Sequence, residues 1–204
     1  MQYVVVGVGT DVGKTVVSAI VVEALKAYYW KPVQAGDLQF TDSHKVAQYA
    51  LSSKGILPEK WRLNTPASPH YAAELDGVFI QSTDFELPNV VGDLIIEGAG
   101  GLMVPLNANG LLYLDIVKQW DLPVILVSRH YLGSINHTLM SLALLKEYGI
   151  KVQLVVFNGD ENQATESIIQ KMHPELTYHR IPNALELDVD FIQQEAERIR
   201  EKLI

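Results

Sequence analysis

The amino-acid sequence predicts a doubly wound α/β fold in which a mostly parallel sheet is flanked by helices. Short, almost entirely apolar runs recur along the chain, as expected for strands that are buried on both faces of a parallel sheet. Stretches with the apolar spacing of an α-helix separate these runs. This alternation continues over the whole length and is typical of a doubly wound sheet, so residues 1–204 are interpreted as a single domain.

Each expected element follows from its local pattern. Uninterrupted apolar runs predict strands at 3–8, 93–98, 122–128 and 152–158, and less regular runs predict strands at 29–34 and 176–182. Helical spacing predicts helices at 13–28, 42–53, 113–120, 136–149, 162–173 and 189–204. The stretch 53–92 is the least regular and is expected to hold a short helix and loops. Because ligands of such folds bind at the carboxyl ends of the strands, polar clusters that follow a strand are candidate site residues.

Composition restricts the class of protein. The chain has 204 residues, of which 48% are hydrophobic, with a net charge of −8 and a pI near 5.2. Such an acidic surface repels nucleic acid and anionic membranes, so neither is an expected partner. The sequence has no cysteine, which excludes disulfides, thiolate catalysis and cysteine-based metal sites. With no recognisable signal peptide or membrane span, we expect a soluble, cytoplasmic protein.

The stretch GVGTDVGKT, from Gly7 to Thr15, carries the pattern of a phosphate-binding loop. It follows a predicted strand and opens a predicted helix, which is the context that such a loop requires. Glycines let backbone N–H groups approach phosphates, and the helix N-terminus adds about half a positive charge. Lys14 would reach the β- and γ-phosphates and Thr15 would bind Mg²⁺, so a P-loop NTPase type of fold with ATP and Mg²⁺ is expected. A glycine-rich turn with a chance GKT is the alternative.

The middle of this loop departs from the standard pattern. Five residues separate Gly7 from Gly13, and one of them is the acid Asp11. A bare carboxylate repels phosphates, so Asp11 is expected to face Mg²⁺ or an amine of a substrate. The alternative is that Asp11 caps the following helix.

Charged residues also follow two other predicted strands. Glu97 ends the strand 93–98, and Asp42 begins the helix that comes after the strand 29–34. An acid at a strand end that faces a phosphate loop is a usual Mg²⁺ partner. Lys31 would add positive charge where charge develops during phosphoryl transfer. Helix capping is the alternative role for Asp42, and a solvated strand end is the alternative for Lys31.

The stretch LGSINHT, residues 132–138, follows the strand 122–128. Ser134 or Asn136 would cap the next helix, whose free N–H groups could hold a carboxylate, although plain capping is the simpler interpretation. His70 and His137 have no partners at metal-ligand spacing and are interpreted as structural or substrate-lining residues.

Taken together, these motifs resemble the dethiobiotin synthetase family in order and approximate spacing. The matching pieces cover nearly the whole chain and are GVGTDVGKT, KPVQAG, TDSHK, PASPHYAA, IIEGAGGLMVPL and LGSINHT. The resemblance implies an ATP-dependent cyclo-ligase of biotin biosynthesis, which joins CO₂ to 7,8-diaminononanoate and gives dethiobiotin, ADP and phosphate. It implies a carbamate on one amine, its conversion to a carbamic-phosphoric anhydride by the γ-phosphoryl group, and ring closure by the second amine.

The same resemblance assigns roles to matching positions. The catalytic residues would be Lys31, Lys14 and Thr10, and the Mg²⁺ ligands would be Thr15, Asp42 and Glu97. The residues that hold the nucleotide would be Asp11, Val12, Gly13, Lys14, Thr15, Val16, Asp42, Glu97, Gly98, Ala99, Gly100, Asn158, Pro182, Asn183 and Ala184. The substrate would contact Thr10, Asp11, Lys31 and Ala35. Across the interface of a homodimer, its carboxylate would bind the helix start formed by Gly133, Ser134, Ile135 and Asn136.

Three features depart from the family pattern. The family commonly has Ser or Thr at the position of Ala35, so one substrate hydrogen bond is missing or comes from elsewhere. The run from Thr15 to Lys31 is shorter than usual, and its helix-to-strand turn KAYYWKP has no glycine. The loop before the last helix is also short, so the acid that often closes over the nucleotide is not clearly assignable, with Glu186 as one candidate.

Other classes of nucleotide-binding protein fit the sequence less well. Related amide-forming ATPases usually carry a glutamine-hydrolysing domain with a cysteine nucleophile, and this chain has no cysteine. A partitioning-type ATPase switch has a signature lysine where this chain has Gly9. A GTP switch would need the guanine-reading Asn-Lys-x-Asp motif, but Gly159 stands where the lysine would be.

Overall fold

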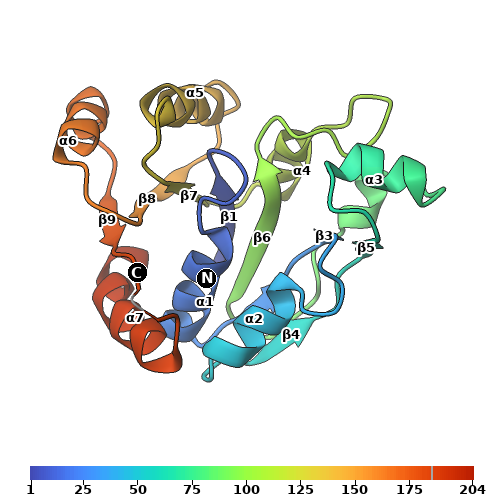
Figure 1. Ribbon diagram of the computed structural model, residues 1–204, viewed down its shortest axis with the longest axis horizontal. Coiled ribbons are helices and arrows are strands. Elements are labelled where there is room, and N and C mark those ends of the chain that lie inside the picture. Colours follow the sequence, from blue (N-terminus) through green and yellow to red (C-terminus); the bar gives the residue numbers. More distant parts are fainter. Residues whose placement is uncertain (185) are drawn as a thin grey trace.

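The computed structural model describes residues 1–184 and 186–204, and its centre is a seven-stranded parallel sheet with the strand order β4-β2-β6-β1-β7-β8-β9 (Figure 1). The strands of this sheet are β1 (Gln2–Gly7), β2 (Tyr28–Trp30), β4 (Gly55–Leu57), β6 (Leu94–Gly101), β7 (Val124–Ser128), β8 (Val152–Asn158) and β9 (Tyr178–Ile181). A separate parallel pair consists of β3 (Val33–Ala35) and β5 (Trp61–Leu63). The doubly wound α/β prediction is therefore confirmed.

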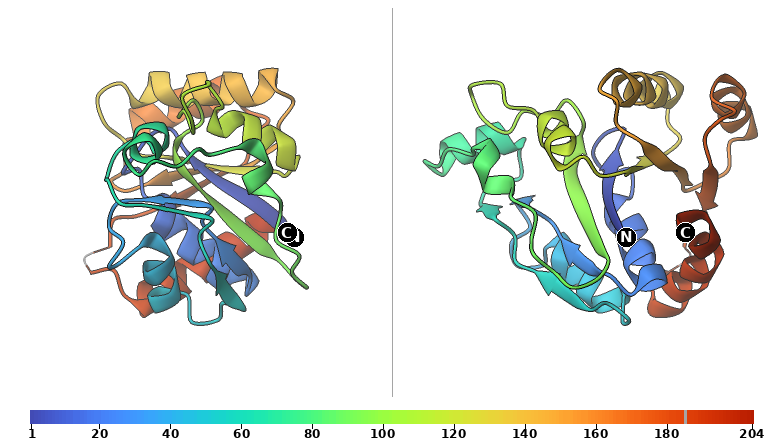
Figure 2. Two further views of the ribbon diagram at one scale, coloured as in Figure 1. Left: turned by 90° about the vertical axis from the view of Figure 1, so that its right-hand side faces the viewer. Right: turned by 180° about the vertical axis from the view of Figure 1, so that it is seen from behind.

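Helices cover both faces of the sheet, as Figures 1 and 2 show. One face carries α1 (Lys14–Leu25), α2 (Asp42–Tyr49) and α7 (Val189–Leu203). The other face carries α3 (Pro69–Leu75), the 3₁₀ helix η1 (Ser82–Phe85), α4 (Tyr113–Trp120), α5 (Ser134–Glu147) and α6 (Gln163–Met172). Among the described residues, no helix has both the length and the apolar character needed to cross a membrane.

The central strands divide the interior into two apolar cores. Successive side chains of a strand point to opposite faces, so Val4 and Val6 enter one core while Tyr3 and Val5 enter the other. Both faces of these strands are buried, which explains why the strands have almost uniformly apolar sequences.

The strand predicted at 29–34 is wrong in detail, because two short strands replace it. β2 ends at Trp30 and β3 begins at Val33. Between them, Pro32 has no N–H to donate to a sheet, although its carbonyl accepts a hydrogen bond from the Trp61 N–H at 2.9 Å. This break lets the chain leave the main sheet at Lys31 and start the β3–β5 pair. β5 and β4 lie in the stretch 53–92, where a short helix was expected and α3 is found, but no strand was predicted.

The helix predicted at 13–28 ends earlier than expected, at Leu25. Lys26 adopts a left-handed backbone conformation with φ 51° and ψ 48°, a position at which helices usually have glycine. The Ala27 N–H then bonds to the Val22 carbonyl at 3.0 Å, which closes the turn. The trimmed connection thus reaches β2 without a glycine because a lysine takes the left-handed position.

Candidate active site

A cleft of about 730 Å³ opens at the carboxyl end of the central strands. Loops that follow β1, β3 and β5, together with the end of β6, supply much of its wall, and this is where ligands bind in doubly wound sheets. Many of the residues selected from the sequence line this one cleft, namely Thr10, Asp11, Gly13, Lys14, Thr15, Lys31, Ala35, Asp42, Glu97, Ala99 and Gly100.

The phosphate-loop motif, Gly7 to Thr15, forms the turn between β1 and α1. Gly13 is the N-cap position of α1 and has φ 94°, which an L-residue with a side chain rarely adopts. A Cβ at Gly13 would lie only 2.0 Å from Nδ2 of Asn158, which donates a hydrogen bond to the Val12 carbonyl at 3.1 Å. Asn158 therefore braces the loop from the end of β8.

Asp11 does not cap α1, so that alternative is wrong. The N-cap position belongs to Gly13, and no side chain makes a cap hydrogen bond there. Asp11 is instead exposed, has a left-handed backbone with φ 56°, and lines the cleft.

Lys14 extends along the inside of the loop. Its Nζ donates to the Gly9 carbonyl at 2.9 Å, and the residue is only 7% exposed. Burial disfavours the charged amine and lowers the pKa of Lys14 to about 8, although nearby Glu97 opposes the shift. An anion bound in the loop would offset this cost, because it would supply the charge partner that the buried ammonium lacks.

The most strongly charged part of the cleft is an ion-pair cluster of Lys31 with Asp42 and Glu97. The Lys31 Nζ donates to Oδ2 of Asp42 at 2.6 Å and to Oε1 of Glu97 at 2.9 Å. Burial by itself would lower the pKa of Lys31, but the charges of Glu97 and Asp42 raise it overall. Lys31 is therefore a paired cation in the interior, and the alternative of a solvated strand end is wrong.

Two neutral side chains hold Glu97, which is 1% exposed. Thr15 Oγ1 donates to Oε1 of Glu97 at 2.9 Å, and the Tyr29 hydroxyl donates to Oε2 at 2.8 Å. Burial and the Glu97 charge keep the pKa of Tyr29 well above its usual value, so Tyr29 stays a donor. Both oxygens of this carboxylate therefore have fixed partners.

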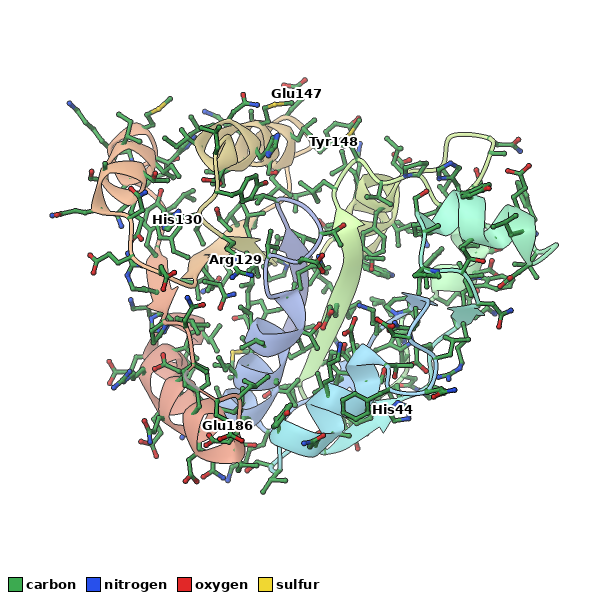
Figure 3. The ribbon with its side chains drawn as sticks, in the orientation of Figure 1. His44, Arg129, His130, Glu147, Tyr148 and Glu186 are labelled. Atoms are coloured by element: carbon green, nitrogen blue, oxygen red, sulfur yellow. The ribbon has the colours of Figure 1, made fainter. Side chains whose placement is uncertain are left out.

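Asp42 stands at the first position of α2 and is not its cap, so the capping alternative is wrong here as well. Thr41 is the N-cap: its side chain accepts from the His44 N–H, and His44, labelled in Figure 3, accepts from the Thr41 N–H in return. Asp42 is left free to bond Lys31 and, through Oδ1, the Lys45 ammonium at 3.0 Å. Burial favours the neutral acid, but these lysines lower the pKa of Asp42 to about 2.

The oxygen atoms in this cluster fit a divalent cation that prefers hard ligands. The Lys31 ammonium contacts one oxygen of each carboxylate, and the Thr15 hydroxyl contacts the Glu97 oxygen that Lys31 also contacts. Mg²⁺ is commonly bound through one or two carboxylates together with waters and substrate phosphates. Within residues 1–184 and 186–204, no group of three or more His, Cys, Asp or Glu residues could hold a metal by itself.

Several residues selected from the sequence lie outside the cleft lining. Val12 is a buried residue of the phosphate loop, and Gly98 packs against Tyr113 of α4, where a Cβ would lie 3.2 Å from the ring. The remaining residues outside the lining are Val16, Gly133, Ser134, Ile135, Asn136, Asn158, Pro182, Asn183 and Ala184, together with Glu186 before α7.

The start of α5 and the loop after β9 nevertheless lie close to the phosphate loop. Gly133, with φ 102°, is the N-cap position of α5 and no side chain caps it, so capping by Ser134 or Asn136 is wrong. The Tyr131 hydroxyl would lie 3.9 Å from a Cβ at Gly9. The loop after β9 is joined to the end of β8, because the Gly159 N–H bonds to the Ile181 carbonyl at 2.8 Å.

Sequence reasoning missed several residues at the site, including Tyr29, Gln34, Lys45 and Arg129. Arg129 follows β7, and its guanidinium donates to the Asp11 carbonyl at 3.4 Å, so it stands beside the phosphate loop (Figure 3). Lys45 could have been found from its i,i+3 spacing to Asp42 on a predicted helix. No local pattern distinguishes the other three.

Comparison with known proteins adds an independent line of information. The family model described as an AAA domain matches residues 1–189. The chain is 50% identical over 203 residues to the ATP-dependent dethiobiotin synthetase of Christiangramia forsetii, covering 99% of this chain and 97% of that protein. It is 48% identical over 193 residues to the protein of the same name from Rhodopseudomonas palustris strain BisB18, covering 94% and 92%.

A solved structure resembles the fold at much lower sequence identity. The cell division ATPase MinD of Pyrococcus furiosus aligns with a TM-score of 0.56 at 16% identity, covering 100% of this chain and 99% of that chain. At this identity the likeness shows a shared fold and nothing about the reaction.

Proposed function

The chain belongs to the family of ATP-dependent dethiobiotin synthetases, and we propose that it joins CO₂ to 7,8-diaminononanoate with consumption of ATP. In this reaction one substrate amine takes up CO₂ as a carbamate and releases a proton. A carbamate oxygen attacks the γ-phosphorus of ATP, so that ADP leaves and a carbamic-phosphoric anhydride forms. The second amine then attacks the carbonyl carbon, phosphate leaves, and the ureido ring of dethiobiotin closes.

One observation carries this assignment at the level of the site. The phosphate loop and the Lys31–Asp42–Glu97 cluster share a single cleft, so a nucleotide and a buried reactive cation can act on the same substrate. Phosphoryl transfer depends mainly on positioning and on positive charge at the transferring group. Lys14 would hold the β- and γ-phosphates, and Lys31 would stabilise the carbamate and the transferring phosphoryl group.

The proposed metal ligands are Thr15, Asp42 and Glu97. When bound there, Mg²⁺ would neutralise charge that develops on the phosphate oxygens. The short distances among these side chains support the assignment, because Thr15 already donates to Glu97 and Lys31 joins Glu97 to Asp42.

The irregular middle of the phosphate loop is the proposed contact with the diamine. Asp11 and Thr10 both line the cleft. The exposed Asp11 carboxylate is negatively charged and would pair with an ammonium group of the diamine. An extra residue in the loop gives room for these two side chains while Gly13, Lys14 and Thr15 keep the phosphates. Asn158, Pro182, Asn183 and Ala184 would face the adenine, with Arg129 between the base and the phosphates.

We also propose that the protein is a homodimer that completes the substrate site at the start of α5. The apolar side chains of Tyr131, Leu132, Ile135 and Met140 are at least 38% exposed on or just before this helix. Exposed apolar groups that gather on one element are typical of a protein interface. The N–H groups at Gly133 to Asn136 would hold the substrate carboxylate from the second subunit.

The catalytic role of Lys31 can be tested by Lys31→Ala. Turnover should fall on the order of 10²-fold, because a preorganised charge at the transition state is lost. ATP affinity should change much less, because Lys14 and the loop backbone hold the phosphates. Single-turnover formation of ADP and dethiobiotin, together with calorimetric titration of ATP, separates the two effects. Unchanged turnover in a folded variant would show that Lys31 has no such role, and absence of product from the wild-type protein would remove the ligase assignment.

The dimer proposal can be tested by Leu132→Asp. The wild-type protein should sediment as a dimer and the variant as a monomer, because a charge would be buried in an apolar interface. The KM for the diamine should rise in the variant, since its carboxylate would lose the second subunit. Leu51→Asp is the matched control, because Leu51 is 63% exposed on a different part of the surface. A monomeric wild-type protein would contradict the proposal.

A further inference from the structure

Lys31 lies at the point where the proposed metal ligands meet. Its Nζ contacts Oδ2 of Asp42 at 2.6 Å and Oε1 of Glu97 at 2.9 Å. The same Glu97 oxygen accepts the Thr15 hydroxyl at 2.9 Å. The ammonium therefore contacts one oxygen of each of the two acids and shares the Glu97 oxygen with the Thr15 hydroxyl.

These carboxylates need a positive partner because they are removed from water. The side chain of Glu97 is 0% exposed, and those of Lys31 and Asp42 are 7% and 19% exposed. An unpaired buried carboxylate is strongly unfavourable, so a cation at this place stabilises the ionised acids in the folded protein. Lys31 provides it, and the register of β2 against β6, which pairs Trp30 with Ile96, brings Lys31 beside Glu97.

A divalent ion held by both acids would compete with the Lys31 ammonium for the same carboxylate oxygens. Mg²⁺ binds oxygen at about 2.0–2.1 Å, so an ion held by both acids would lie within a few ångströms of the present Nζ position. Two cations at that separation repel strongly in a water-poor site. We therefore expect that loading of the metal site weakens the contacts of Lys31 with Asp42 and Glu97.

We propose that Lys31 is a resident counter-ion, which occupies the metal position in the ligand-free protein and is released toward the reacting end of the cleft when the metal binds. The inference rests on the proposed metal ligands. Lys31 would thus have two positions, one on Asp42 and Glu97 and one at the carbamate. Binding of the divalent ion would move the side chain from the first position to the second. Lys45 remains on the outer oxygen of Asp42 and keeps that carboxylate in place during the exchange.

The decisive measurement is Mn²⁺ affinity in the absence of nucleotide, followed by electron paramagnetic resonance. Lys31→Met should bind Mn²⁺ about tenfold more tightly than the wild-type protein, because the competing ammonium is gone and a tenfold change needs only ~1.4 kcal/mol. Lys31→Arg keeps the charge and should stay close to the wild type. Lys60→Met is the control for net charge, since the Lys60 side chain is 49% exposed and pairs with Asp84 at 3.7 Å.

A second measurement uses the wild-type protein and does not depend on a variant that folds. Acetylation of Lys31 by an amine-reactive reagent, quantified by mass spectrometry, should accelerate several-fold when Mg²⁺ is added without nucleotide. Lys60, with a side chain that is 49% exposed, serves as the internal reference and should not change.

These experiments distinguish failure of the Lys31 exchange from failure of the proposed metal site. Folded Lys31→Met that binds Mn²⁺ no more tightly than the wild type, or Lys31 acetylation that is unchanged at saturating Mg²⁺, would overturn the exchange while leaving the metal site standing. If no form of the protein binds Mn²⁺, with or without ATP, the metal ligands and the exchange both fail.

Discussion

At the scale of single residues, Ala35 is a cleft position where the family resemblance leads us to expect a side-chain hydroxyl. Ala35 ends β3 and lines the cleft, but it offers no side-chain hydrogen bond. Ala35→Ser should lower the KM for the diamine several-fold, since one added neutral hydrogen bond contributes about 0.5–1.5 kcal/mol. Steady-state kinetics at saturating ATP would measure it, and the KM for ATP should stay constant as the internal control. An unchanged or higher KM for the diamine would show that the missing hydroxyl is replaced elsewhere.

Single residues also show where sequence patterns stop being informative. Lys31 and Glu97 could be selected because each follows an apolar run, and family resemblance gave both a role. Their contact depends on the register of β2 against β6, which local sequence does not specify. Tyr29 was missed for the same reason: in sequence it is one more apolar strand residue, and only the folded sheet brings its hydroxyl to Glu97.

At the scale of elements, Gly36 follows β3 and packs closely against Pro66, which follows the paired strand β5. It has φ 73°, and a Cβ there would lie 2.5 Å from the Cβ of Pro66, which also lines the cleft. Gly36→Ala should destabilise the protein by about 2–4 kcal/mol, from left-handed backbone strain and from displacement of Pro66. Urea unfolding would measure the loss, and the KM for the diamine should rise because the wall shifts.

A matched glycine separates strain from contact in that experiment. Gly77 has φ 67°, but a Cβ there would meet nothing within 4 Å. Gly77→Ala should therefore cost only about 1 kcal/mol, from the backbone alone. Equal losses in the two variants would mean that the contact with Pro66 does not constrain β3.

The elements that could be predicted from sequence are those that are buried along their length and therefore have a recognisable apolar pattern. Long strands such as β1 and β8 are buried on both faces, so their sequences are continuously apolar. In contrast, β4 and β5 have three residues each and are only partly buried, which leaves no apolar run to detect. The early end of α1 could not be predicted from sequence either, because the residue with the left-handed backbone there is a lysine and not the expected glycine.

At the scale of the whole molecule, the C-terminal helix α7 completes one of the two cores and packs against a buried histidine of β9. His179 of β9 has a side chain that is 9% exposed, and its Nε2 lies 3.9 Å from Oε2 of Glu195 on α7. Neither atom has a hydrogen-bond partner within the described parts of the chain. Burial, together with the positive charges of Lys202 and Arg198, lowers the pKa of His179 to about 4.

Stability should therefore decrease in acid through His179. Between pH 6.5 and pH 4 the unfolded chain binds a proton that the folded protein does not, so the free energy of unfolding should fall by about 1–3 kcal/mol as the pH drops through this range. His179→Gln cannot take up that proton, and urea titrations from pH 7 to pH 4.5 should show a flatter dependence. Some slope will remain, because burial and Arg180 also lower the pKa of His130. The same slope in His179→Gln as in the wild type would show that the packing of α7 against β9 does not control this titration.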